Sequence, residues 1–206
     1  GVEKLLYLIV THPHPDHLAG LVAVAKNFRV GQFWEGRAAG DEGLYAELLR
    51  ALPKGARRRC GRGLLCREGE TMIAVLHPER SDTDGGSAGG NENSLVIKIS
   101  LGETAFLFMG DVGIAAESEL LGTGLALGAS VLKAGHHGSG TASSAAFLAA
   151  VRPELVLVSV GEGNTYGFPG PAFLERCRGA AAEASRLTEE SRSRLGTAEL
   201  GLTRTA

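Results

Sequence analysis

The sequence predicts a layered α/β domain in which a sheet packs between helices. Short apolar runs that are typical of strands alternate with helix-forming segments along the chain. The 206 residues suffice for one domain, and 44% of them are apolar, which is enough for a buried core. Glycine is frequent, at 30 residues, whereas aromatic residues make up only 5%. This composition suits a loop-rich α/β protein better than a helical bundle.

The first third of the chain is expected to alternate strand and helix. The apolar run at its start indicates a buried strand, and the only tryptophan, Trp34, lies in a short second strand. The second helix is amphipathic and stops at Pro53. We therefore expect strands over residues 4–10 and 30–35 and helices over residues 18–28 and 44–52. The arginine-rich stretch 57–67 is interpreted as a solvated hairpin, with phosphate contact as the alternative.

Further strands and helices follow a long glycine-rich loop. We interpret this loop, residues 81–93, as either flexible or a lid over a site. A tight turn at Gly102-Glu103 joins two strands, and the second is apolar on both faces, which predicts a central position. We expect strands over residues 71–76, 94–101, 104–109, 130–133 and 155–160, and helices over 115–121, 143–151 and 171–184. The tail is polar, with one weak strand candidate at 198–202.

Net charge, the length of the apolar runs and the cysteine count argue against a strongly basic nucleic-acid binder, a membrane-spanning chain and a disulfide-rich protein. The net charge is −2, so no global attraction to nucleic acid is expected, although a local basic surface remains open. No apolar run reaches the roughly 18 residues of a membrane span. The chain begins with Gly1 rather than Met and shows no signal peptide, so we interpret it as a fragment. Three cysteines argue against a disulfide framework, and Cys60 and Cys66 are expected to be unpaired.

A histidine-rich stretch follows the first strand. Thr11-His12-Pro13-His14-Pro15-Asp16-His17 places three histidines and a carboxylate within six residues. Its two prolines predict a rigid loop rather than a helix. His12 and His14 are two residues apart, so in an extended loop their side chains point the same way, while Asp16 and His17 can face a second position. The stretch indicates a metal site.

A second set of candidate ligands lies far along the chain. Asp111 ends a buried strand after a glycine, and burying a bare carboxylate costs several kcal/mol, so we expect a cation beside it. His136 and His137 follow another strand, although one of the two could only brace the loop. Imidazole and carboxylate suit zinc, manganese or iron. A pair of such ions about 3.5–4 Å apart would activate water. His77, which ends a strand before proline, is expected to be structural.

These residues carry a resemblance to a known family. His12-x-His14-x-Asp16-His17 resembles the H-x-H-x-D-H signature of the metallo-β-lactamase fold. Further segments occur in the order and spacing of one branch, the C-terminal domain of the ComEC DNA-internalisation competence proteins and their stand-alone relatives. These segments are Asn93 to Val96, Phe106 to Asp111, Leu132 to Ser139, Ser159-Val160-Gly161 and Asn164-x-Tyr166-Gly167. The resemblance covers residues 4–169.

The resemblance implies a fold and a ligand set. The fold would be a four-layer αβ/βα sandwich that holds two divalent transition metal ions, zinc or manganese. Asp111 would bridge the ions, and Asp16 would also orient or deprotonate the attacking water. The first ion would be bound by His12 and His14, and the second by Asp16, His17 and His136. Asn93 stands where many members of the wider fold have a histidine, which implies that the first ion is weaker or that only one is tightly bound.

The same resemblance implies a hydrolase that cleaves phosphodiesters, with DNA as its partner, in other words a nuclease of DNA uptake. Lys133, Ser139 and Tyr166 could contact phosphate oxygens, with His137 in support. A structural role is an equal alternative for Lys133 and Tyr166. Two further alternatives remain open: a small-molecule hydrolase of esters, phosphoesters or lactones, and a non-catalytic remnant.

Two departures from the family pattern bear on these expectations. The opening strands of the branch would precede Gly1, so residues 1–184 are expected to be a hydrolase domain lacking its N-terminal strands, followed by a polar tail over 185–206 with a last strand. Phe168 stands where the branch tends to have a histidine, which implies a lost substrate contact. The chain would lie at the extracytoplasmic face of the membrane as part of a competence protein, and in the cytoplasm if it stands alone.

Overall fold

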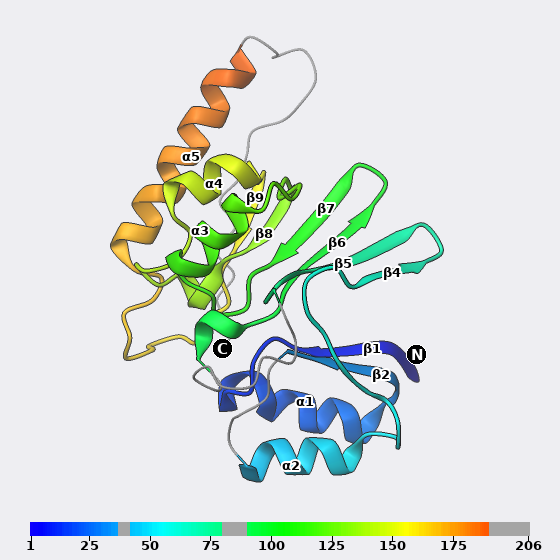
Figure 1. Ribbon diagram of the computed structural model, residues 1–206. Helices are drawn as coiled ribbons and strands as arrows, with labels where there is room; N and C mark the ends of the chain where they lie inside the picture. Colours follow the sequence, from blue (N-terminus) through cyan, green and yellow to red (C-terminus); the bar gives the residue numbers. More distant parts are fainter. Residues whose placement is uncertain (37–41, 80–89, 190–206) are drawn as a thin grey trace.

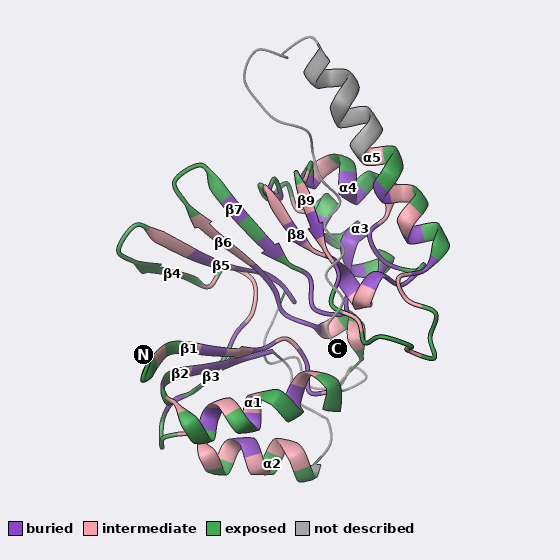
Figure 2. Cartoon of the chain, turned by 180° about the vertical axis from the view of Figure 1, so that it is seen from behind, coloured by how far each residue is buried: buried purple, intermediate pink, exposed green. Residues whose placement is uncertain are grey.

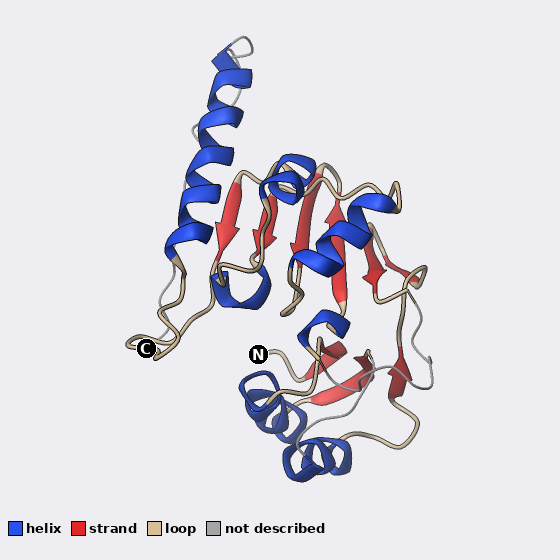
Figure 3. Cartoon of the chain, turned by 60° about the vertical axis from the view of Figure 1, so that its left-hand side comes forward, coloured by secondary structure: helices blue, strands red, loops and turns tan. Residues whose placement is uncertain are grey.

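The protein is an αβ/βα sandwich of four layers (Figure 1). The computed structural model describes residues 1–36, 42–79 and 90–189. Within these ranges the helices lie on the two outer sides and two sheets lie between them, as Figure 3 shows. One outer layer consists of α1 (Pro15–Asn27) and α2 (Glu42–Ala51). The other consists of α3 (Ile114–Gly122), α4 (Ala145–Val151) and α5 (Pro171–Glu189). The expected fold class is confirmed.

The smaller sheet is parallel and has the order β1-β2-β3. Its strands are β1 (Lys4–Val10), β2 (Arg29–Glu35) and β3 (Arg57–Arg59). The arginines of β3 were expected in a hairpin, and that prediction is wrong. They form an edge strand parallel to β2, and the next strand belongs to the other sheet. The arginine pattern indicated exposure correctly, because every residue of β3 is exposed.

The larger sheet is mixed and has the order β4-β5-β6-β7-β8-β9. The pairs from β4 to β7 are antiparallel, and β7, β8 and β9 run parallel to one another. Its strands are β4 (Leu65–Glu68), β5 (Thr71–His77), β6 (Val96–Leu101), β7 (Thr104–Phe108), β8 (Val131–Lys133) and β9 (Leu155–Leu157).

Strand β7 is central, as expected, but it is not buried on both faces. Phe106 and Phe108 are 39% and 37% exposed, while Ala105 and Leu107, which alternate with them, are buried. The core between the two sheets contains residues of β5 and β6 and none of β7, which explains this difference. Apolar residue types alone could not show how far the smaller sheet extends.

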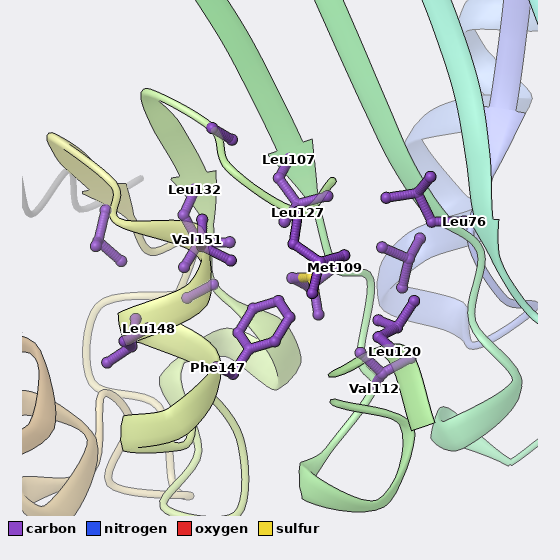
Figure 4. Close-up of a cluster of buried hydrophobic side chains, with 14 of the residues drawn as sticks. Leu76, Leu107, Met109, Val112, Leu120, Leu127, Leu132, Phe147, Leu148 and Val151 are labelled. Carbon is purple, nitrogen blue, oxygen red and sulfur yellow. The ribbon is translucent and has the colours of Figure 1, made fainter. Parts of the chain in front are cut away.

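Three apolar clusters hold the layers together. The one beneath α1 and α2 receives Leu18, Val22 and Ala25, which recur at helical spacing on one face of α1. Trp34 lies between the two sheets with no exposed surface. The largest cluster packs the six-stranded sheet against α3, α4 and α5, and Figure 4 shows Phe147 within it. Figure 2 shows how the buried residues follow these interfaces.

Helix α1 begins earlier than the sequence predicts. It starts at Pro15, so Asp16 and His17 lie in its first turn and the predicted rigid loop ends at His14. Proline is compatible with this position because the first turn of a helix needs no N–H donor there. Helix α4 was expected from residue 143 and begins at Ala145, after a cap in which Ser144 Oγ accepts a hydrogen bond from the Phe147 N–H at 3.2 Å.

Some expectations concern segments at the edge of the described ranges. The glycine-rich loop lies mostly in residues 80–89, outside the described residues, and its end forms a 3₁₀ turn, η1 (Asn91–Asn93). Helix α5 continues five residues beyond the expected end at 184, and the strand candidate at 198–202 lies outside the described residues. All three cysteines are unpaired. Among the described helices, none combines the length and apolarity needed to cross a bilayer.

Candidate metal centre

Three segments meet where β1, β7 and β8 end. The first is the turn from β1 into α1, the second is Gly110-Asp111 after β7, and the third is the 3₁₀ segment η2 (Gly135–Gly138) after β8. The second and third segments are joined directly, since the His136 N–H donates to the Gly110 carbonyl at 3.1 Å. The first is joined through Ser94-Leu95, where the Leu95 N–H donates to the Thr11 carbonyl at 2.9 Å and Ser94 Oγ accepts from the Asp111 N–H at 3.1 Å. Residues distant in sequence are thereby fixed beside each other.

Four side chains converge at this junction. One nitrogen or oxygen atom from each of Asp16, His17, Asp111 and His137 lies within 4.8 Å of those of the other three. Asp111 is 3% exposed, and His17 and His137 are partly buried, whereas the Asp16 side chain is 60% exposed. The group is therefore open to solvent on the side of Asp16.

Gly110 is needed to bring Asp111 into this group. Its φ is +54°, and a Cβ atom there would lie 2.7 Å from the Ser94 Cβ and 2.9 Å from the Thr11 Cβ. The backbone therefore passes closer to its neighbours than any side chain allows. The Asp111 N–H then donates to Ser94 Oγ at 3.1 Å.

The segment η2 contains backbone strain. His136 and His137 have φ values of +45° and +53°, a region that costs a residue with a side chain about 1–3 kcal/mol. The Ser139 N–H holds the turn by donating to the His136 carbonyl at 2.9 Å. Gly138, with φ of +79°, packs so closely that a Cβ atom would lie 2.9 Å from the Pro169 side chain. Such strain is typical of functional sites.

The orientation of His137 determines its protonated nitrogen. Its Nδ1 lies 2.8 Å from the Ser159 carbonyl oxygen, which can only accept, so the Nδ1–H donates. A neutral His137 therefore presents a bare Nε2 to the group. That atom lies 3.3 Å from one carboxylate oxygen each of Asp16 and Asp111, and 3.2 Å from His17 Nε2. The Nε2 acceptor of neutral His137 thus faces two carboxylate acceptors, and a proton or a cation must lie between them.

His12 faces the same oxygen of Asp111 as His137 does and is more deeply buried. His12 Nε2 lies 3.7 Å from Asp111 Oδ2, and both residues are nearly inaccessible. Neither His12 Nε2 nor Asp111 Oδ1 has a hydrogen-bond partner. Burial, assisted by the charge of His17, lowers the pKa of His12 to about 4, so this imidazole is neutral at pH 7. A buried, unpartnered imidazole nitrogen beside a carboxylate is suited to bind a metal ion.

The carboxylate of Asp111 is ionised in these surroundings. Burial opposes its ionisation, but His137 and His17 outweigh that effect and hold the pKa of Asp111 well below its usual range. The hydrogen bond to Asp111 in turn raises the pKa of His137. Neutral imidazoles and ionised carboxylates are the donor set of first-row divalent metals. The residues present therefore fit a metal ion.

The other predicted ligands lie close by but outside this group of four. His14 directly precedes α1, and its ring centroid is 4.4 Å from that of His12. His136 was expected to complete the site, but His137 joins the group instead, and His136 Nε2 lies 3.2 Å from Asn91 Nδ2. The left-handed turn decides which neighbouring histidine faces Asp111, and no residue pattern reveals that choice.

The residues expected to contact substrate have different surroundings. Lys133 Nζ donates to the Ala134 carbonyl at 2.9 Å; burial lowers its pKa, and the nearby charge of Asp111 opposes that shift. Ser139 Oγ braces its own loop, 3.0 Å from Thr141 Oγ1. Asn93 closes the 3₁₀ turn η1, since its N–H donates to the Gly90 carbonyl at 3.0 Å. Tyr166 is 79% exposed.

Sequence reasoning did not single out two groups that position the site. The Ser159 carbonyl orients His137, and the Asn91 side chain contacts His136. A backbone carbonyl carries no sequence signal, and an asparagine next to a glycine-rich stretch is more typical of a turn. The structural role expected for His77 is consistent with its contact, because its Nε2 lies 2.7 Å from the Glu92 carbonyl oxygen and can only donate there.

Comparisons with known proteins agree with this geometry. The sequence model of the Metallo-beta-lactamase superfamily matches residues 1–162. Competence protein ComA of Neisseria gonorrhoeae is 34% identical over 179 residues, which are 86% of this chain and 23% of that protein. ComE operon protein 3 of Bacillus subtilis is 27% identical over 177 residues, 85% of this chain and 22% of that protein. The chain thus spans under a quarter of the length of these relatives.

A solved structure shares the fold. The metallo-beta-lactamase fold protein YhfI from Bacillus subtilis superposes with a TM-score of 0.50 at 10% sequence identity. The match covers 98% of this chain and 76% of that one. At such low identity the likeness concerns the arrangement of the layers and not the chemistry.

Proposed function

The chain belongs to the metallo-beta-lactamase superfamily, and from that premise we propose that it is a metal-dependent hydrolase that cleaves the phosphodiester bonds of single-stranded DNA. The observation that carries the proposal is the group of Asp16, His17, Asp111 and His137, in which the carboxylate oxygens of Asp16 and Asp111 face the unprotonated Nε2 of a neutral His137. Such a set is unfavourable without a cation and favourable with one.

Two ions of zinc or manganese would use the residues around Asp111. Asp16, His17, Asp111 and His137 would hold one ion, and His12 with Asp111 and His14 would hold the other more weakly. When bound, such ions lower the pKa of a water molecule and polarise a phosphoryl oxygen.

The protein's own residues divide the remaining work. Asp16, whose side chain is the most exposed of the group, can accept the proton of the attacking water and pass it to solvent. His137 keeps its orientation through the bond from its Nδ1 to the Ser159 carbonyl. Lys133 lies near enough to Asp111 for that carboxylate to favour its charged form, which raises the pKa of Lys133 against the effect of burial. Its ammonium group can neutralise a phosphate oxygen.

The choice of DNA as substrate is supported by the resemblance to the ComEC branch and by the similarity to Competence protein ComA and ComE operon protein 3. Because the chain spans only 23% and 22% of those proteins, their activities as whole proteins do not transfer automatically. If this chain is part of a similar larger protein, we propose that it acts at the extracytoplasmic face of a membrane. If it acts alone, the cytoplasm is the expected compartment.

The test measures bound metal and cleavage in parallel. Purified protein is analysed for transition metals after mild buffer exchange, and then incubated with an end-labelled single-stranded oligodeoxynucleotide, with p-nitrophenyl acetate and with a simple lactone. The variants are Asp111→Asn and His137→Ala, with His136→Ala as the matched control because His136 lies next to the group without belonging to it.

We expect one to two equivalents of metal and cleavage of the oligonucleotide. Asp111→Asn and His137→Ala should each lose cleavage by more than about 100-fold, the upper end of what groups outside the ligand set cost, while His136→Ala should retain its metal. Activity on the esters or the lactone alone would refute the DNA substrate. Less than about half an equivalent of metal would instead indicate a non-catalytic remnant.

A further inference from the structure

An exposed tyrosine ring and a partly buried phenylalanine ring lie at the rim of the metal centre. Tyr166 and Phe168 lie in the segment between β9 and α5, with ring centroids 5.6 Å apart and ring planes inclined by 19°. Tyr166 is 79% exposed, although tyrosine is a large, mostly apolar side chain. The two rings thus form a stack that ends in solvent.

The stack is continuous with the histidines of the metal centre. The edge of one ring of the pair His136–Phe168 meets the face of the other, with centroids 5.8 Å apart and planes at 68°. The His136 ring is in turn 6.4 Å from that of His137, which belongs to the group of four. A row of neighbouring rings, Tyr166, Phe168, His136 and His137, therefore connects a ligand that covers Tyr166 with the proposed reaction centre.

The loop that carries the rings is held rigidly. Asn164 bonds to Phe168 twice, since its Nδ2 donates to the Phe168 carbonyl at 2.8 Å and its Oδ1 accepts from the Phe168 N–H at 2.9 Å. The Gly170 N–H then donates to the Gly138 carbonyl at 2.9 Å, which joins the loop to η2. Because the rings are already stacked and fixed, little conformational entropy would be lost when a ligand binds them.

A recess of mixed polarity adjoins the same loop. Phe168 lines this cavity of about 400 Å³, whose other walls include Val158, Leu174, Glu162 and Asn164. Phe168 therefore contacts the metal centre through His136 and also borders a recess open to a ligand.

We propose that Tyr166 and Phe168 form a stacking platform for a nucleobase of the DNA strand whose phosphate reaches the metal centre. This inference rests on the proposed function. Every base presents a π-face, so stacking on aromatic rings binds single strands with little dependence on sequence. A base inside a duplex has both faces covered by its neighbours, so the platform selects single strands over duplexes.

Binding is measured separately from cleavage. The probe is a single-stranded oligodeoxynucleotide with phosphorothioate linkages, which resist hydrolysis, and with one 2-aminopurine whose fluorescence falls when it stacks on an aromatic ring. A second probe has the same backbone but abasic sites in place of all bases. The metal-loaded protein is compared with Tyr166→Ala and with Tyr166→Phe, which keeps the ring and lacks only the hydroxyl group.

We expect Tyr166→Ala to weaken binding of the base-containing strand by about 5- to 150-fold, the range for loss of one base–aromatic stack, and to abolish the quenching. Tyr166→Phe should bind like the parent, and the abasic strand should bind the parent and Tyr166→Ala equally. In cleavage of an ordinary strand, Tyr166→Ala should raise KM and leave kcat nearly unchanged, because Tyr166 contacts the base and not the reacting atoms.

Equal affinities of the parent and Tyr166→Ala for the base-containing strand would overturn the platform, even if the strand is cleaved, and the proposed function would then stand alone. Conversely, a Tyr166-dependent loss of binding without any cleavage of ordinary DNA would support the platform and refute the proposed function. An equal loss of affinity of Tyr166→Ala for the abasic strand would also overturn the platform.

Discussion

Replacement of Gly110 by alanine tests how the two halves of the metal centre are held together. A Cβ atom at this position would lie 2.7 Å from the Ser94 Cβ and 2.9 Å from the Thr11 Cβ. Thr11 opens the histidine segment, and Ser94 accepts the hydrogen bond from the Asp111 backbone. The added methyl group therefore cannot be accommodated unless the segments that carry the ligands move apart.

Two costs add at Gly110. Its φ of +54° lies in the left-handed region, which costs a residue with a Cβ atom about 1–2 kcal/mol. Contacts below 3.0 Å with two packed side chains add overpacking, which typically costs about 1–3 kcal/mol. Together the free energy of unfolding should fall by about 2–5 kcal/mol, a large share of the roughly 5–15 kcal/mol that stabilises an ordinary domain.

Gly69 provides a matched control. Its φ of +60° is almost the same, but nothing lies within 4 Å of a Cβ atom built there. Gly69→Ala should therefore cost only the conformational part, about 1–2 kcal/mol. Urea unfolding of both variants, followed by the fluorescence of Trp34 with metal chelated, gives the two free energies of unfolding. Trp34 is a suitable probe because it is fully buried and is the only tryptophan.

The difference between the free energies of unfolding of the two variants gives the contribution of the close packing at Gly110. Gly110→Ala should also bind transition metal more weakly, since Asp111 is displaced, whereas Gly69→Ala should bind it like the parent. If the two variants lose the same stability and Gly110→Ala keeps its metal affinity, the close approach of the strand ends does not hold the site together.

Three further predictions concern buried groups outside the metal centre. Glu117 is 1% exposed and accepts hydrogen bonds from two backbone N–H groups at the start of α4. Glu117→Ala should therefore lower the free energy of unfolding by about 2–5 kcal/mol, whereas Glu103→Ala, at an exposed position, should lower it by less than about 0.5 kcal/mol. Equal urea midpoints for the two variants would contradict this prediction. Burial raises the pKa of Cys60 and of Cys177 to about 11. Iodoacetamide at pH 8 should therefore label the partly exposed Cys66 first, as detected by mass spectrometry. Early labelling of Cys60 or Cys177 would show that these two thiols are not protected by burial. Because these thiols ionise near pH 8.5 when unfolded, the unfolded state releases protons first and the free energy of unfolding should decrease as the pH rises from about 9 to 11.

Much of the site could be predicted because its chemistry is local in sequence. His12, Asp16 and His17 follow a buried strand, and Asp111 follows another after a glycine. Strand ends of layered α/β domains gather at one edge, so polar residues at those positions meet. The positions of these side chains agree with that expectation, and their roles as ligands remain proposals.

Other features depend on backbone geometry that no residue pattern shows. His136 and His137 are chemically identical neighbours, and only the left-handed turn with its contact to the Ser159 carbonyl places His137 in the group. Likewise, α1 begins at Pro15, so Asp16 and His17 lie in its first turn and not in the loop that the sequence predicts. Both differences arise from dihedral angles and from tertiary hydrogen bonds.

The sequence by itself determined the layered α/β architecture, the apolar strands and the two clusters of histidine and aspartate, because periodicity and side-chain chemistry are local properties. The tertiary structure decided that β3 pairs with β2, that Phe106 and Phe108 lie beyond the core between the sheets, and that His137 faces Asp111. It also placed the stacked rings of Tyr166 and Phe168 beside the metal centre. These features depend on contacts between segments distant in the chain, and such contacts are fixed only when the sheets and loops pack together.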